Sequence, residues 1–311
     1  MELQQQNTSS PMNKSFGFAV GMLGLGFTGM LLISYFVYLA ITGIFAALGL
    51  WMTADFAVLL NDICIYCLGL PFLLIIGHFI PNGASMPFRP KKTLHPGGFA
   101  KFACIGYAGL YLSSLVTSVL LTIANLFSGK SAGNSVGEVL NSLSPVTAFL
   151  LVAVLPAIME ELVFRAYLYK KLIRFGELPY ILLSGVFFAA YHANFEQVLY
   201  AFVLGCWMAY MLCRTGTVVY GMMLHLLINF YSSNVINEVV SSGFASTLLM
   251  VVSIVLTILG CIFFANIRKT LYVRPSVTLP PNPVMRYFAN PGTILWLGTF
   301  LGMAVVTYLF N

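Results

Sequence analysis

Apolar runs of about 20 residues recur along the whole chain, and a run of this length can cross a bilayer as an α-helix. We place these runs at 17–49, 55–80, 99–127, 146–169, 178–192, 196–213, 217–240, 243–267 and 293–310. Strands of transmembrane barrels alternate apolar and polar residues, and these runs do not alternate. The sequence therefore predicts an all-α fold, a polytopic transmembrane helical bundle of about nine spans (eight to ten), in which the first run forms one long tilted helix.

The composition also indicates a membrane protein. Only 8% of the 311 residues are charged and 59% are hydrophobic, whereas about a quarter of a soluble domain is charged. The chain is therefore expected to be an integral, multi-pass protein in contact with the lipid bilayer. Its net charge of +6 does not imply nucleic-acid binding, because most basic residues lie between the apolar runs. The six cysteines lie within these runs and are expected to pack as small hydrophobic side chains.

Basic residues occur in alternate loops between the runs. One set of loops contains Arg89, Lys91, Lys92, Lys101, Lys170, Lys171, Arg174, Arg214, Arg268, Lys269, Arg274 and Arg286. The opposite set contains only Lys130. Because cytoplasmic loops are enriched in Lys and Arg, we expect the basic loops and the N-terminus in the cytosol, including the proline-rich loops at 81–98 and 270–292. We expect a bacterial plasma membrane; an endoplasmic reticulum membrane would show the same bias.

The segment "EELVFR" places two carboxylates and an arginine at the end of the fourth run, where charge is costly and points to a functional site. Glu161 and Arg165 are spaced to share a helical face, whereas Glu160 is rotated by about 100° from Glu161. The guanidinium can then hold one carboxylate while the other points elsewhere. Burial and a neighbouring carboxylate both favour a proton on a glutamate. A glutamate on which a proton is favoured in this way can act as a general base that takes a proton from water near neutral pH.

Two histidines and an asparagine lie in neighbouring runs. His192 ends the fifth run, and His225 lies in the seventh run one turn before Asn229. Along straight helices, at ~1.5 Å per residue, Glu161 and His192 lie roughly 22–24 Å from the turn between the fourth and fifth runs. His225 and Asn229 lie about 14 and 20 Å from the turn that precedes their own run. These heights are compatible with one polar layer within the membrane, formed by three helices.

Three short motifs resemble those of the CAAX-protease and bacteriocin-processing family, which includes the Abi proteins and the type II CAAX prenyl endopeptidases. "EELVFR" resembles the family's EExxxR motif, "FAAYH" (Phe188–His192) resembles FxxxH, and "HLLIN" (His225–Asn229) resembles HxxxN. The resemblance covers residues 145–240 and includes an Arg-Thr-Gly stretch between the last two motifs. One departure is Ala166, because the family often has glycine after the arginine.

The resemblance implies an intramembrane endopeptidase that uses a glutamate-activated water and neither a metal nor another cofactor. Glu160 would be the general base, oriented by Glu161 and Arg165. The histidine of the second motif would hold and polarise the water. The histidine and the asparagine of the third motif would donate hydrogen bonds to the oxyanion. The catalytic candidates are Glu160, Glu161, Arg165, His192, His225 and Asn229. The expected partner is a peptide or protein substrate at the membrane.

On this resemblance the chain divides into four parts. These are a cytosolic tail (1–16), unassigned N-terminal membrane helices (17–140), a catalytic core (141–242), and C-terminal membrane helices with a basic, proline-rich loop (243–311). The residues themselves leave other functions open. Two glutamates and two histidines could supply a zinc site, although no HExxH is present. A proton-coupled transporter could use the same groups with Asp62, and an immunity protein could bind a peptide without cleaving it.

Overall fold

The structure is a computed structural model that describes residues 11–81, 93–128, 135–233, 243–274 and 290–310. Every regular element in these ranges is helical. Seven of the described helical segments are long and apolar enough to cross a membrane: Ser15–Ala47, Ala54–His78, Pro96–Phe127, Pro145–Phe175, Phe195–Thr215, Ser246–Ile267 and Pro291–Tyr308. The predicted polytopic helical bundle is therefore confirmed.

The helical segments that precede the turn at Gly176 follow one another in chain order. They are α1 (Pro11–Ala47), α2 (Ala54–Ile63), η1 (Cys64–Gly69), α3 (Leu70–His78), α4 (Pro96–Ser128), α5 (Ser135–Asn141), α6 (Pro145–Thr147), η2 (Ala148–Val154), α7 (Leu155–Glu160), η3 (Glu161–Tyr167), α8 (Leu168–Leu172) and η4 (Ile173–Phe175). The π-helical segments are η1, η2 and η3, and η4 is a 3₁₀ turn. The remaining helices are α9 (Glu177–Tyr191), α10 (Phe195–Thr215), α11 (Val219–Ser232), α13 (Gly243–Ile267) and α15 (Pro291–Phe310).

The first run forms a single continuous helix, as the sequence predicts. With 37 residues, α1 is about 55 Å long, which exceeds the ~30 Å hydrocarbon core of a bilayer. The expected spans at 178–192 and 217–240 correspond to shorter helices, α9 with 15 residues and α11 with 14. Residues 234–240 of the expected span at 217–240 lie outside the described residues, as do residues 1–10 and most of the loops at 81–98 and 270–292.

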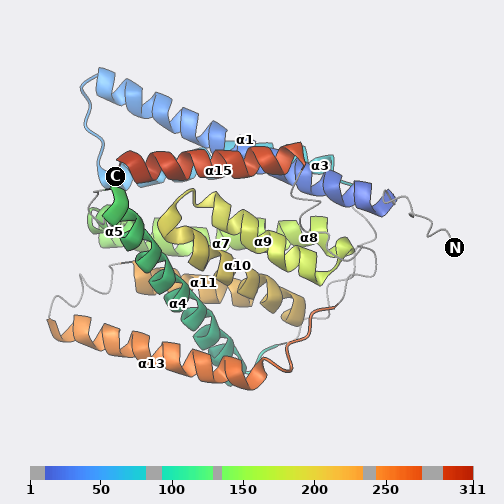
Figure 1. Ribbon diagram of the computed structural model, residues 1–311. Coiled ribbons are helices and arrows are strands. Elements are labelled where there is room, and N and C mark those ends of the chain that lie inside the picture. The colour runs from blue at the N-terminus through green and yellow to red at the C-terminus, as the bar shows by residue number, and fades with distance from the viewer. Residues whose placement is uncertain (1–10, 82–92, 129–134, 234–242, 275–289, 311) are drawn as a thin grey trace.

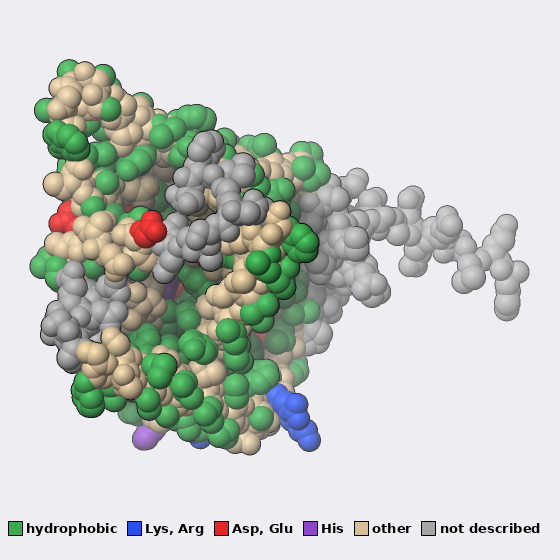
Figure 2. Space-filling model, turned by 60° about the vertical axis from the view of Figure 1, so that its left-hand side comes forward, with side chains coloured by type: hydrophobic (Ala, Val, Ile, Leu, Met, Phe, Trp, Pro, Cys, Tyr) green, Lys and Arg blue, Asp and Glu red, His purple; other side chains and the backbone are tan. Residues whose placement is uncertain are grey.

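The central helices α7 to α11 lie between two outer groups (Figure 1). One group contains α1, α3 and α15, and the other contains α4 and α13. An aromatic cluster joins the centre to the first group. The ring of Phe27 in α1 lies 4.8 Å from Phe187, 5.2 Å from Phe164 and 5.4 Å from Trp296, measured between centroids. Hydrophobic side chains also prevail on the surface in Figure 2, as expected for helices that face lipid.

Helices α9 and α10 approach each other closely through two glycines. A Cβ atom on Gly205 would lie 2.8 Å from the Cα of Gly185, which is closer than real Cβ contacts. Small residues at such an interface let membrane helices pack backbone to backbone. This packing brings the end of α9, which carries the second motif, against the centre of the bundle.

Gly205→Val is therefore expected to destabilise the protein. The added methyl groups would force α9 and α10 apart, and overpacking of this kind costs about 1–3 kcal/mol. Gly302→Val is the matched control, because Gly302 is also helical and has no atom within 4 Å of its would-be Cβ. Thermal unfolding in detergent would compare the two variants with the wild type. Equal losses of stability in both variants would contradict the close packing of α9 on α10.

One acidic residue connects several turns at one end of the bundle. Glu177, buried at the start of α9, forms an ion pair with Arg214 at the end of α10. It also accepts a hydrogen bond of 2.9 Å from the main-chain nitrogen of Arg274, beyond α13. Nearby, Arg174 donates to Ser15 in α1 over 3.3 Å. We call the contacts of Glu177 with Arg214 and Arg274 the Glu177 clasp. These contacts place several of the predicted basic loops at the same end as the start of α1.

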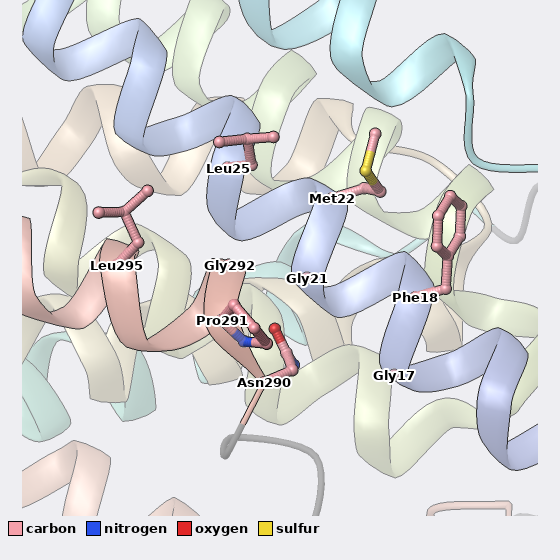
Figure 3. A pocket seen from close by; sticks show the side chains of 9 residues that line it. All are labelled: Gly17, Phe18, Gly21, Met22, Leu25, Asn290, Pro291, Gly292 and Leu295. Carbon is pink, nitrogen blue, oxygen red and sulfur yellow. The ribbon is translucent and has the colours of Figure 1, made fainter.

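A pocket lies between α1 and α15 (Figure 3). Its lining comes from Gly17, Phe18, Gly21, Met22, Leu25, Asn290, Pro291, Gly292 and Leu295. No acidic, basic or nucleophilic side chain is among these residues. The pocket therefore offers no chemistry for hydrolysis and is distinct from the polar cluster described next.

Candidate active site

The two glutamates lie where α7 passes into the π-helix η3. The side chains are buried, with 7% of Glu160 and none of Glu161 exposed to solvent. Nη1 of Arg165 lies 3.0 Å from Oε1 of Glu161, so the expected pair one turn apart forms an ion pair. The guanidinium also lies over the ring of Phe188, with Cζ 4.1 Å from the ring centroid. Arg165 is completely buried, and its charge is compensated within the cluster.

His225 of α11 contacts both glutamates. Its Nδ1 lies 3.1 Å from Oε1 of Glu161, and its Nε2 lies 3.7 Å from Oε2 of Glu160. The first distance is a hydrogen bond, whereas the second is too long for one. Gly221, one turn earlier, makes room for this contact, because a Cβ there would lie 2.6 Å from Oε2 of Glu161. The third motif is thus brought onto the first, with the histidine between the two carboxylates.

His192 lies at the end of α9 and shares a neighbour with His225. The ring of Phe188 contacts His192 at 4.9 Å and His225 at 5.7 Å, both edge to face. Nδ1 of His192 lies 2.8 Å from the carbonyl oxygen of Phe188. A carbonyl can only accept, so Nδ1 carries a proton, and Nε2 of a neutral ring is then a hydrogen-bond acceptor. The following residue, Ala193, has a φ of 46°, a conformation that is uncommon outside glycine and ends the helix here.

Asn229 holds α11 against η2. Its amide donates to the carbonyl oxygen of Val152 over 3.2 Å. In an α-helix this carbonyl would accept from the residue four positions later, which is Pro156, and proline has no N–H. The asparagine therefore donates to a carbonyl whose partner in a regular α-helix would be a proline. One of its two N–H groups is used in this way, and the other is available.

Two residues that sequence reasoning missed support the π-helix that carries Arg165. In η3 the main-chain N–H of Leu168 donates to the carbonyls of Arg165 and Val163 and bypasses that of Phe164. Ser184 of α9 donates to this bypassed carbonyl over 2.8 Å. Tyr180, one turn before Ser184, donates to the carbonyl of Arg165 over 3.2 Å. The sequence spaces Tyr180, Ser184, Phe188 and His192 four residues apart, and this spacing could have indicated that they share the supporting face.

Ser184→Ala is expected to weaken the support of η3. The carbonyl of Phe164 would lose its donor in a buried place, which costs about 1–2 kcal/mol. Ser118→Ala is a matched control, because Ser118 is exposed on α4. We expect the thermal midpoint in detergent to fall for Ser184→Ala and to stay within error for Ser118→Ala. A Ser184→Ala protein as stable as the wild type would show that this hydrogen bond does not hold the π-helix.

Comparison with known protein families identifies the segment that contains this cluster. Residues 142–231 match the family model described as type II CAAX prenyl endopeptidase Rce1-like. This segment is an Rce1-like CAAX protease domain. The match confirms the family resemblance of the motifs, and all six candidates lie within it. The chain matches no curated protein and no solved structure. Together with the apolar helices, the family indicates a hydrolase, a membrane protease that acts on peptide or protein substrates in the bilayer.

Several buried polar atoms of the Rce1-like domain have no hydrogen-bond partner among the described residues. Those in the cluster are Oε2 of Glu161 and the Nε, Nη1 and Nη2 atoms of Arg165, whose ion pair lacks hydrogen-bond alignment. Buried polar groups are normally satisfied by protein, water or ligand. The cluster therefore has capacity to bind further polar groups. In the described part of the chain, no three His, Cys, Asp or Glu side chains are arranged to hold a metal ion.

Proposed function

We propose that the protein is an intramembrane endopeptidase in which Glu160 activates a water molecule. The observation that carries the proposal is the position of His225 between the two glutamates, at 3.1 Å and 3.7 Å, within the Rce1-like domain. Glu161 is already held by Arg165 and His225. Glu160 has the weaker contact and is the more exposed of the two carboxylates, so it is the one with freedom to accept a proton.

In the proposed reaction Glu160 takes a proton from water while the water oxygen bonds to the carbonyl carbon of the peptide. The π electrons of the carbonyl move onto its oxygen and form the oxyanion. When the C=O bond forms again, the C–N bond breaks, and its electron pair stays on nitrogen, which takes the proton from Glu160. His192, with Nδ1 bound to a carbonyl, presents Nε2 as an acceptor that can orient the water.

His225 and Asn229 are the proposed donors to the oxyanion. Nδ1 of His225 lies 3.1 Å from Oε1 of Glu161, and Nε2, at 3.7 Å from Glu160, makes no hydrogen bond to it, so a proton on Nε2 would be available to the oxyanion. Asn229 keeps one N–H free after its bond to Val152. Donors held in place by other contacts stabilise developing negative charge without reorganisation. The unsatisfied atoms of Glu161 and Arg165 support a wet rather than an apolar site.

We place the protein in a bacterial plasma membrane with its N-terminus in the cytosol. The basis is the bias of Lys and Arg among the loops, together with the contacts that bring Arg174, Arg214 and Arg274 to the end where α1 begins. The proposed substrates are peptides or proteins of that membrane, cut within or close to the bilayer.

A comparison of membrane proteomes tests the function and identifies the substrate. Cells that carry the wild type and cells that carry Glu160→Ala would be compared for new peptide termini. A terminus that is present with the wild type and absent with the variant would support the proposal and give the cleavage site. Identical termini in both strains would count against proteolysis and favour a transporter or an immunity protein. Cleavage of the identified substrate would then be repeated after exhaustive chelation, and loss of activity would replace the glutamate mechanism with a zinc-dependent one.

A further inference from the structure

Helix α3, in the second membrane span, contacts the end of the π-helix η3. Tyr167, the last residue of η3, donates its hydroxyl hydrogen to the carbonyl oxygen of Leu73 over 3.4 Å. Gly77, one turn after Leu73, makes room for the tyrosine, because a Cβ there would overlap Oη of Tyr167 and lie 2.8 Å from its Cζ. Leu73 and Gly77 are both buried. We call these two residues the α3 notch, and the ring of Tyr167 ends in it.

Lys171 makes a second contact with the same span. Its side chain is buried, and Nζ donates to the carbonyl oxygen of Ile80 over 3.4 Å. This carbonyl lies just beyond the carboxyl end of α3, where a helix favours positive charge. Nζ also lies 5.9 Å from the centroid of the Tyr167 ring. Tyr167 and Lys171 are one turn apart, and so are Leu73, Gly77 and Ile80 in succession, so two complementary helical faces meet here.

The orientation of η3 matters for the proposed reaction, because this segment carries Glu161 and Arg165. A π-helix has wider turns than an α-helix, so the rotation of its side chains depends on where the segment begins and ends. From α9, Ser184 donates to the carbonyl of Phe164 in the middle of η3. From α3, the notch holds Tyr167 at its end. The end of η3 therefore cannot rotate or slide without moving the tyrosine out of the notch.

We propose that Tyr167 is a positioning residue of the active site. Seated in the α3 notch, it fixes the rotation of η3 and thereby the place of Glu161 and Arg165 relative to Glu160, and it does not touch the substrate. The inference rests on the proposed function of Glu160. It also makes α3 part of the catalytic unit, although this helix lies outside the match at 142–231.

Gly77→Ala tests the proposal by filling the notch. The added methyl group would push Tyr167 out and shift η3, and a small misplacement of catalytic groups is costly for turnover. We expect kcat per folded enzyme to fall about 10- to 100-fold, with KM within about 2-fold of the wild type. Gly298→Ala is the control, because Gly298 in α15 has no atom within 4 Å of its would-be Cβ, and it should leave kcat unchanged. Cleavage of the substrate found by proteomics provides the assay.

A second substitution should rescue the first. Gly77→Ala combined with Tyr167→Phe lacks the hydroxyl that collides with the new methyl group, so kcat should rise at least about 5-fold above that of Gly77→Ala. Tyr167→Phe alone keeps the ring in the notch and loses one neutral hydrogen bond, so its kcat should stay within about 3-fold of the wild type. If Gly77→Ala does not fold, Tyr167→Leu takes its place, because it leaves the notch empty and should lower kcat about 10-fold relative to Tyr167→Phe.

Two results would overturn the inference. One is a lower thermal midpoint for Gly77→Ala with kcat per folded enzyme unchanged, since the notch would then stabilise the fold without positioning the site. The other is a double variant as slow as Gly77→Ala. Thermal unfolding of the two single variants and the double variant tests the contact without cleavage, because losses that simply add would show that the hydroxyl and the methyl group do not meet. Full cleavage by Glu160→Gln would instead refute the proposed function and leave this coupling in stability unaffected.

Discussion

Glu160→Gln is expected to abolish peptide hydrolysis and to leave the fold intact. The amide has the shape of the carboxylate but cannot take a proton from water, and loss of a general base lowers turnover by about 10²–10⁴-fold. The fold should survive, because Glu161 keeps its contacts with Arg165 and His225. The measurement is single-turnover cleavage of the identified substrate in liposomes, together with the thermal midpoint.

Glu138→Gln is the matched control for this variant. Glu138 is exposed on α5, so the same chemical change there should leave turnover within error of the wild type. The general-base assignment fails if Glu160→Gln keeps more than about a tenth of wild-type turnover. If the variant is inactive but also unfolded, the thermal midpoint shows it, and Glu160→Asp then separates charge from shape.

Arg165→Met is expected to produce the largest loss of stability among the single substitutions. It would leave Glu161 with His225 as its remaining partner in a completely buried place. Breaking a buried ion pair by removing one partner costs about 3–5 kcal/mol, because an uncompensated charge remains. The stacking of the guanidinium on Phe188 at 4.1 Å would also be lost. Unfolding in detergent or by steric trapping in bicelles would measure the difference.

Two further variants test whether this loss comes from the charge of Arg165. Arg268→Met is the control, because Arg268 is exposed after α13, and its stability should stay close to that of the wild type. Adding Glu161→Leu to Arg165→Met removes the stranded charge, so the double variant should recover a large part of the loss. A double variant no more stable than Arg165→Met would show that packing, and not charge compensation, sets the role of the arginine.

The parts of the site that depend on local spacing were predictable from the sequence. The separation of Glu161 and Arg165 by one helical turn predicted their shared face, and the ion pair at 3.0 Å has this geometry. The order of the three motifs predicted the family. Counting residues along straight helices showed only that His225 could reach the glutamates. It could not show which ring nitrogen would face which carboxylate, because that depends on the rotation of α11.

The remaining parts depend on helix packing and on local departures from α-helical geometry. The π-helix that leaves the carbonyl of Phe164 to Ser184 has no clear signature in composition. Asp62 was recognised as an intramembrane acid, but the sequence did not indicate that α2 packs against η2. Nothing in the sequence around Glu177 marks it as a contact between distant turns. Its partner Arg274 is 97 positions away, and pairs this distant have no local pattern.

The Glu177 clasp sets a lower limit on the minimal functional unit. Arg274 lies 43 residues beyond the end of the match at 231 (274 − 231), and Phe27 packs on the domain from the other direction. A chain trimmed to the matched residues would expose these apolar surfaces and leave Glu177 with one counter-ion fewer. During synthesis, the clasp can close only after position 274 has left the ribosome. The peptidase would therefore mature only after α13 has been inserted.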